Sequence, residues 1–266
     1  MKSIYHYTSS KSLNGIICKE GVVFFATRFD GFEDKLEYVW ARDFISPYLK
    51  SMAQEEGKKY ESDFTQYPFI ISFCKNENDA FMWEHYGKKD HSDENSDENS
   101  DESYGVELIL DSDEIKKYGS SQVRWLDIFQ EVEYSDNNEK SLKAAIKRAY
   151  GSYQYPSDDP VADYNEIACF IKQKEKFAKE KEVRYLRVYH DVLCLQPDGT
   201  EESKDETPEI LFRKKSIPYI KIVFPKSVLQ GIIIRCHLDF NSEEEKIKLL
   251  LKDREYPNDL KIDQSL

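Results

Sequence analysis

Residues Ile4–Ile17 form the stretch IYHYTSSKSLNGII, which predicts how the fold begins. Ile4–Tyr7 has the composition of a short strand, and Ser9 or Ser10 can cap a following helix whose apolar residues recur at helical spacing. Gly21 stands where a glycine commonly ends a helix. We therefore expect a strand, a short helix and a turn before the next strand.

Further apolar runs continue this pattern along the chain. We expect strands at Val22–Ala26, Phe69–Cys74, Tyr104–Leu110, within Gln122–Tyr134, and at Val183–Tyr189, Tyr219–Phe224 and Gln230–Cys236. We expect helices from Asp34 to about Met52 with a break or kink at Pro47, and at Asp79–Tyr86, Lys140–Tyr150, Asp163–Phe177 and Glu243–Lys252. Because strands and helices do not alternate strictly, the order favours an α+β or irregular α/β fold over a doubly wound sheet.

The net charge of −13 is concentrated in two runs. Asp90–Ser103 holds seven acids and no lysine or arginine, and Gln196–Glu209 has a net charge of −5. We interpret the regions at about 88–103 and 196–210 as disordered acidic insertions in one large domain spanning residues 1–266. The overall charge argues against a broad basic face for duplex nucleic acid, although the remaining body is nearly neutral.

The chain shows no signal for a membrane or a zinc site. It has no apolar run near the length of a membrane-spanning helix and no secretory signal at its start. The five cysteines are scattered and never form a CxxC pair, which is typical of reduced, mostly buried thiols. We therefore expect a cytoplasmic protein with no metal site and no membrane partner.

Two groups of residues are candidates for chemistry on strands. In the predicted first strand, His6 and Thr8 share one face, and such a histidine is most simply a satisfied residue of a half-buried strand. In the later strand, Glu180, Glu182 and Arg184 share a face. These charges form either a solvated edge or the wall of a cleft in which arginine holds a carboxylate.

Two further groups lie on predicted helices. Trp83 and Tyr86 are three residues apart, which suits core packing or, alternatively, a stacking wall for a flat heterocycle. Asp34 begins a helix, where a carboxylate is stabilised by the helix dipole, and Glu37 with Tyr38 follows one turn later.

Taken in order, these pieces resemble one family. They are IYHYTSSKSLNGII, FFATRFDGFEDKLEY, ISFCKNENDAFMWEHYG, YGVEL, FAKEKEVRYLRV, and IPYIKIVFP with GIIIR. In this order they resemble the bacterial family of unknown function numbered 2971, over roughly Ile4–Arg235. That family in turn resembles the ADP-ribosyltransferases, remotely.

The resemblance implies a split, twisted β-sheet core with flanking helices and a single catalytic domain. It implies NAD as the substrate and transfer of ADP-ribose to a macromolecular acceptor, as in a toxin or an antiphage defence effector. His6, with Tyr7 and Thr8, matches the cofactor-binding first strand, and Glu182 matches the late catalytic acid. Ser72 is the nearest stand-in for the family's Ser-Thr-Ser, which is a departure from the pattern.

The remaining candidates receive roles from the same resemblance. Glu180 would orient or deprotonate the acceptor, and Arg184 would contact the pyrophosphate or position Glu182. Tyr38, Tyr86 or Trp83 would stack the nicotinamide. This hypothesis requires His6 and Glu182 to face one cleft.

Two other functions remain open. One is a non-catalytic nucleotide- or partner-binding module on the same fold. The other is a nuclease or hydrolase that holds a divalent metal with Asp34, Glu37, Glu180 and Glu182, because carboxylates suit Mg²⁺. The acceptor, whether protein or nucleic acid, and the oligomeric state are not fixed by these patterns.

Overall fold

The computed structural model describes residues 3–32, 37, 40–55, 57, 68–87, 104–120, 125–152, 166–189, 210–213, 217–236 and 239–265. Asp34 and Tyr38 lie outside these residues, as do the two acidic runs apart from Ile210.

The strands are β1 (Ser3–Ser9), β2 (Ile17–Cys18), β3 (Gly21–Arg28), β4 (Phe69–Cys74), β5 (Gly105–Asp111), β6 (Trp125–Glu131), β7 (Glu133–Ser135), β8 (Ile171–Gln173), β9 (Glu182–Tyr189), β10 (Leu211–Arg213), β11 (Ile217–Phe224), β12 (Leu229–Arg235) and β13 (Lys261–Gln264). The α-helices are α1 (Ser10–Ile16), α3 (Ser46–Glu55), α4 (Ala80–Tyr86), α5 (Ser112–Ser120), α6 (Glu139–Gly151), α8 (Lys174–Phe177) and α9 (Phe240–Asp253). Short helical turns are η1 (Phe29–Gly31), η2 (Ala41–Ile45), η3 (Ala178–Glu180) and η5 (Lys226–Val228).

Eleven of these strands form one mostly antiparallel sheet that divides at β4. The main order is β10-β11-β3-β4-β1-β5-β12-β13, and β9 pairs with the other edge of β4 and with β6. Strand β3 pairs with the start of β4 (Arg28 with Phe69), whereas β1 pairs with its end (Tyr5 with Cys74). Because β1 and β3 share one edge of β4, the sheet forks there, and we call this place the fork.

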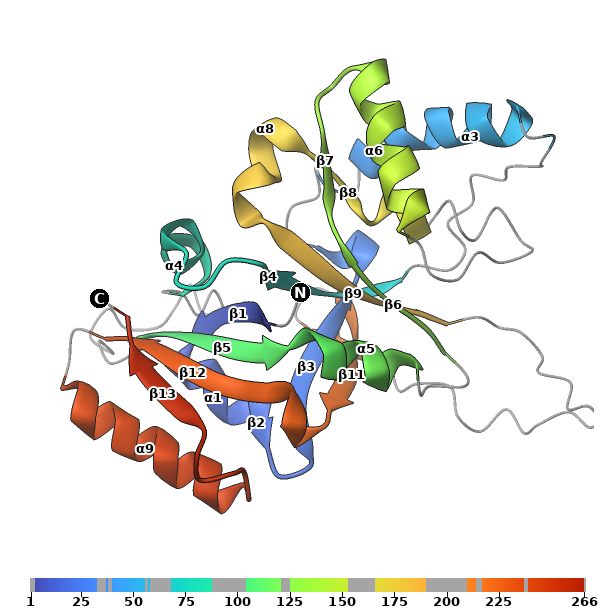
Figure 1. Ribbon diagram of the computed structural model, residues 1–266. Helices are drawn as coiled ribbons and strands as arrows, with labels where there is room; N and C mark the ends of the chain where they lie inside the picture. Colours follow the sequence, from blue (N-terminus) through green and yellow to red (C-terminus); the bar gives the residue numbers. More distant parts are fainter. Residues whose placement is uncertain are drawn as a thin grey trace, which may run out of the picture.

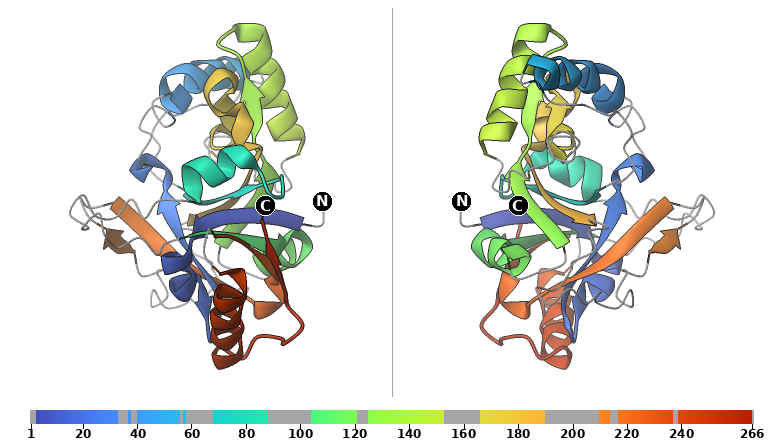
Figure 2. Two further views of the ribbon diagram at one scale, coloured as in Figure 1. Left: turned by 90° about the vertical axis from the view of Figure 1, so that its left-hand side faces the viewer. Right: turned by 90° about the vertical axis from the view of Figure 1, so that its right-hand side faces the viewer.

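Helices cover both faces of the twisted sheet (Figure 1). Below it, apolar residues of α1, α5 and α9, including Leu13, Ile115 and Ile247, belong to the largest buried cluster. Above it, Leu49 of α3 and Ile146 of α6 belong to a second cluster. The side views of Figure 2 show α9 and the α3–α6 layer at opposite ends of the molecule. The two cores place the fork in the middle of the structure.

Most of the expected elements are present, and the expected mixed helix-and-sheet architecture is confirmed. Ser9 caps α1 by accepting a hydrogen bond from the Ser12 amide. The apolar run Phe69–Cys74 forms β4 with the predicted bounds. No helix in the described parts of the chain is long and apolar enough to cross a membrane.

Two predictions about helices are wrong, one about where a helix ends and one about whether a helix is continuous. Gly21 does not end α1, because that helix stops at Ile16 and Gly21 begins β3. Its φ of +148° brings it so close to the neighbouring strand that a Cβ atom would lie 2.2 Å from the Phe224 carbonyl oxygen. The predicted helix Asp163–Phe177 is interrupted, since Ile171–Gln173 pairs with β7 as strand β8 before α8 begins.

The prediction of an irregularity at Pro47 is met by a change of helix type. The π-helical turn η2 (Ala41–Ile45) runs directly into α3, of which Pro47 is the second residue. The helical path is therefore irregular next to the proline, as expected of a residue without a backbone N–H.

Candidate functional site

A cavity of about 790 Å³ lies at the fork. Its middle is lined by β1, β3 and β4, including His6, Phe24 and Ser72. Residues of α1 line one end, and residues of α4, α8 and β9 line the other. The cavity therefore runs past the place where the sheet divides, from α1 at one end to α8 at the other.

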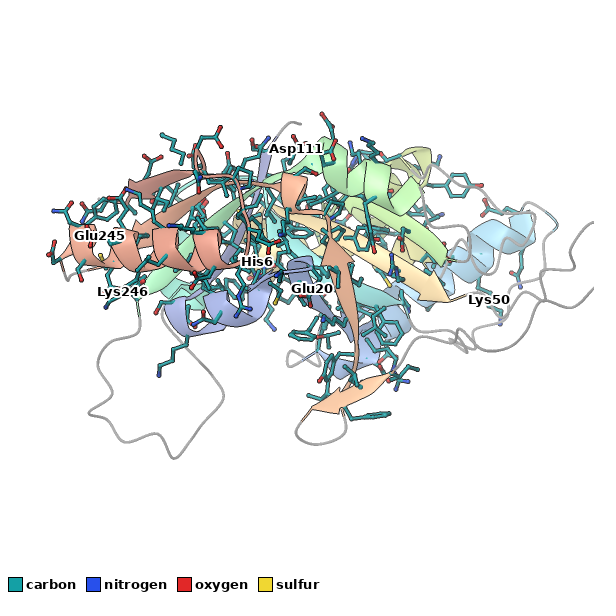
Figure 3. All side chains as sticks on the ribbon, turned by 90° about the horizontal axis from the view of Figure 1, so that it is seen from below. His6, Glu20, Lys50, Asp111, Glu245 and Lys246 are labelled. Atoms are coloured by element: carbon teal, nitrogen blue, oxygen red, sulfur yellow. The ribbon has the colours of Figure 1, made fainter. Side chains whose placement is uncertain are left out.

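His6 of β1 lies in the middle of this cavity lining. Its ring meets Phe24 edge-on at a centroid distance of 4.9 Å, and its Nδ1 lies 3.4 Å from the Ser72 carbonyl oxygen. Burial lowers the pKa of His6 to about 4, although the Ser72 carbonyl opposes this shift. His6 is therefore neutral at physiological pH. Figure 3 shows it near the centre of the molecule, whereas Lys50 and Glu245 lie at opposite ends.

His6 and Glu182 border this one cavity from opposite faces of the sheet. Glu182 pairs with Cys74 of β4, and Tyr5 pairs with Cys74 from the other side, so these three side chains share a face. Strand alternation then places His6 on the opposite face, where its ring lies 6.1 Å from that of Phe73. The fork joins the two faces, which is why both residues line the same space.

The upper end of the cavity holds five charged side chains, Glu37, Lys172, Glu180, Glu182 and Arg184, which we call the carboxylate cluster. Lys172 Nζ lies 2.7 Å from Glu180 Oε2, 2.8 Å from Glu182 Oε2 and 3.1 Å from Glu37 Oε2. The Lys172 side chain is only 4% exposed. Three carboxylates from two separate segments therefore converge on one buried ammonium group.

Arg184 is the second cation of the cluster and is 1% exposed. Its Nε donates to Glu182 Oε1 at 2.7 Å, its Nη2 donates to Glu37, and its Nη1 donates to the Cys169 carbonyl oxygen. The guanidinium also lies over the rings of Phe29 and Phe32, at 6.0 and 5.7 Å from their centroids. Arg184 therefore holds the Glu182 carboxylate in place.

The cluster keeps Glu182 ionised. Burial alone would raise the pKa of Glu182, but Arg184 and Lys172 outweigh it and lower that pKa to about 2. Burial raises the pKa of Glu180, although Lys172 partly opposes this, and the charge of Glu182 raises it further. Neighbouring carboxylates in different ionisation environments are the usual basis for dividing acid and base roles.

The aromatic candidates lie in different places. Tyr86 of α4 lines the cavity, is 46% exposed, and donates a hydrogen bond of 3.1 Å to Glu180. Trp83 is 1% exposed and donates from Nε1 to the Asn78 side chain at 2.8 Å. With its ring faces covered, Trp83 belongs to the core and has no face left for a ligand. Of the two, only Tyr86 offers a stacking surface.

Tyr7 and Thr8 also line the cavity. The Tyr7 hydroxyl, however, donates to the Asn76 carbonyl oxygen at 2.8 Å and accepts from the Asp79 amide at 2.8 Å. It thereby fixes the loop that leads into α4. Tyr7 is a positioning residue for α4, and Thr8 remains a partly exposed hydroxyl on the wall.

Two residues of the site were missed at the sequence level. The first is Lys172, which lies in the segment wrongly predicted as helix. The second is Tyr134, whose hydroxyl accepts a hydrogen bond of 2.8 Å from the Glu182 backbone amide. The available signal for Lys172 was a lysine directly after the apolar run Ile167–Ile171, where a charged residue needs a buried partner.

The carboxylate cluster contains three of the four acids that the nuclease or hydrolase hypothesis assigns to a divalent metal. Among the described residues, no group of three or more His, Cys, Asp or Glu side chains is arranged to hold a metal ion. Glu37, Glu180 and Glu182 instead surround Lys172, so a side-chain cation occupies the position that a metal would take.

Searches for related proteins gave no further information on this site: no family model, no curated protein and no solved structure matches the chain.

Proposed function

We propose that the chain binds NAD in the cavity at the fork and transfers ADP-ribose to a macromolecular acceptor, on a core of the ADP-ribosyltransferase type. One observation carries the proposal. The strands that bear His6, Ser72 and Glu182 are adjacent in the sheet as β1, β4 and β9, and all three residues line one cavity. The resemblance requires this juxtaposition of segments that are far apart in the sequence.

The charges suit the proposed chemistry. With three carboxylates and two cations, the cluster has a formal charge of −1, which favours the positively charged nicotinamide ring of NAD. Breaking the bond between nicotinamide and ribose develops positive charge on the ribose, and an ionised Glu182 beside it stabilises that state. Nicotinamide leaves with the bonding electron pair, and the acceptor nucleophile forms the new bond to the ribose.

The other residues supply positioning and proton transfer. Tyr86 offers its exposed ring to the nicotinamide. Glu180, whose pKa is raised by burial, takes the proton that the acceptor loses. Neutral His6, in the middle of the cavity lining, offers one hydrogen bond to a ribose hydroxyl of NAD. The cavity volume of about 790 Å³ falls within the range of ligand pockets, roughly 300–1,000 Å³.

The direct test measures NAD turnover by the wild type and by Glu182→Gln. We expect the wild type to release nicotinamide and to label an acceptor in a cell lysate with radioactive ADP-ribose, and Glu182→Gln to lose at least 100-fold in rate. Glu175→Gln, at an exposed position of α8, is the matched control and should keep the wild-type rate. Absence of nicotinamide release from the folded wild type, with lysate present, contradicts transfer.

A second candidate function is favoured by the engagement of Glu182. Its two oxygens already contact Lys172 and Arg184, as suits a structural carboxylate in a nucleotide-binding module without chemistry. Calorimetry separates the two functions. Binding of NAD without release of nicotinamide, and with similar affinity in Glu182→Gln, identifies the binding module.

A further inference from the structure

The two ends of the cavity differ in charge. Three cations line it among the described residues, namely Lys11, Lys172 and Arg184. Lys172 and Arg184 belong to the carboxylate cluster at the upper end, where their charges are matched by Glu37, Glu180 and Glu182. Lys11 comes from α1 at the other end, and its side chain is exposed. No acidic side chain within the described ranges is paired with Lys11.

The surroundings of Lys11 are polar and open. The hydroxyl-bearing residues Thr8 and Ser12 line the same end of the cavity, and Ser12 Oγ is 3.1 Å from Ser9 Oγ. Gly15 is four residues after Lys11 in α1 and therefore lies on the same helix face. A Cβ atom at Gly15 would meet nothing within 4 Å, so the space beside Lys11 has room for a ligand group.

We propose that Lys11 binds the diphosphate of a dinucleotide whose cationic ring lies against the carboxylate cluster. This inference rests on the proposed function and adds to it the residue that recognises phosphate. Arg184, the candidate from the sequence, is enclosed by Glu37, Glu182 and the Cys169 carbonyl, and each of its three side-chain nitrogens already donates to one of them. A ligand with a cation at one end and a diphosphate further along complements both ends of the cavity.

The test uses two probes that differ in phosphate, ADP-ribose and adenosine, with binding measured by calorimetry on the full chain. In Lys11→Met we expect the affinity for ADP-ribose to fall roughly 10-fold, as the loss of one hydrogen bond to a charged group implies. The affinity for adenosine should change less than twofold. Lys19→Met removes an exposed lysine outside the cavity that pairs with Glu255, and should bind ADP-ribose like the wild type.

A second pair of variants tests the charge of Lys11 without changing that residue, by offsetting it with a nearby carboxylate. Gly15→Glu places a carboxylate beside Lys11, whereas Gly15→Gln places a neutral group of the same size there. We expect ADP-ribose to bind Gly15→Glu roughly 10-fold more weakly than Gly15→Gln, and this ratio to shrink at high salt. Both variants should fold, since replacing a helical glycine that faces open space favours the helix.

The outcomes separate this inference from the proposed function. If the wild type turns over NAD and Lys11→Met leaves its KM and the ADP-ribose affinity unchanged, the role of Lys11 is refuted while the transferase stands. If ADP-ribose binds in a Lys11-dependent manner and no NAD is turned over, the transferase is refuted while the role of Lys11 stands. A folded wild type that binds neither probe refutes both.

Discussion

Lys172 is the residue on which the carboxylate cluster depends. Its ammonium group neutralises charge from Glu37, Glu180 and Glu182, and it also lies 4.4 Å from the centroid of the Phe177 ring. Burial alone would lower the pKa of Lys172, but the neighbouring carboxylates, led by Glu182, raise it overall. Lys172 is therefore charged at physiological pH.

Replacing Lys172 by methionine should destabilise the protein severely. The change leaves three buried carboxylates with only Arg184 to compensate them, and breaking a buried ion pair from one side costs about 3–5 kcal/mol. We expect the free energy of unfolding in urea to fall by this amount. Lys174→Met, two residues further on with 58% of its side chain exposed, should change it by about 0.5 kcal/mol or less.

A double variant tests whether charge, and not lost packing, is the cause. Glu180→Gln removes one of the three carboxylates, so it should restore part of the stability of Lys172→Met. If Lys172→Met and the double variant lose the same free energy of unfolding, this account is contradicted. A packing defect at Lys172 would not depend on the charge of Glu180.

At the scale of single elements, α4 is the helix that brings Tyr86 to the cavity, and a cap holds its start. Asp79 Oδ1 accepts hydrogen bonds from the amides of Phe81 and Met82, at 2.9 and 3.3 Å. The helix has only seven residues, so it depends on such local contacts.

Asp79→Ala should therefore lower the free energy of unfolding by about 1 kcal/mol, the usual cost of losing a cap. Asp79→Asn keeps an oxygen in the capping position and should cost less than half as much. Thermal unfolding followed by circular dichroism measures both. Equal losses in Asp79→Asn and Asp79→Ala would show that the charge of Asp79, and not its capping oxygen, is what matters.

Elements with an unbroken local signal could be predicted from the sequence, and those decided by distant contacts could not. The apolar run of β4 and the capped helix α4 have such signals. The segment before Phe177 has apolar residues that fit a helix equally well. Its Ile171 and Lys172 become a strand because they pair with Glu133 and Tyr134 of β7, which no local pattern reveals.

The same division holds for the site. Glu180, Glu182 and Arg184 could be grouped because they are neighbours in sequence. Their partner Glu37 comes from a distant segment and Lys172 from strand β8, whose formation depends on its pairing with β7. The location of His6 across the sheet from Glu182 depends on the fork, which is a property of strand order.

At the scale of the whole molecule, stability should depend on pH through buried acids outside the cluster. Glu107 is fully buried. Both its carboxylate oxygens accept a hydrogen bond from the Asn78 backbone amide, at 3.0 and 3.1 Å. Burial raises the pKa of Glu107 to about 7, with Asn78 and Tyr7 opposing and Glu77 and Asp79 reinforcing the shift. Burial likewise raises the pKa of Glu166 to about 8.

The sign of the effect follows from which state keeps the proton. Above its ordinary pKa of 4.5, Glu107 is ionised in the unfolded chain but stays protonated in the folded protein up to pH 7 or so. The free energy of unfolding should therefore fall as pH rises through this window. Glu107→Gln should reduce the loss between pH 5 and 8 by about 1–3 kcal/mol, measured by urea unfolding at both values. An unchanged loss in this variant would contradict the assignment.

The fork gives the molecule an enclosed sheet edge. Between the positions where β3 and β1 pair with β4, residues 71–73 meet no described strand on that side. On an outer edge, such backbone groups would invite pairing with another chain and aggregation. Here residues 71–73 line the cavity at the fork, whose volume of about 790 Å³ suits a small molecule. The architecture thus opens part of a sheet edge to a ligand while shielding it from intermolecular association, and His6 already contacts the Ser72 carbonyl oxygen there.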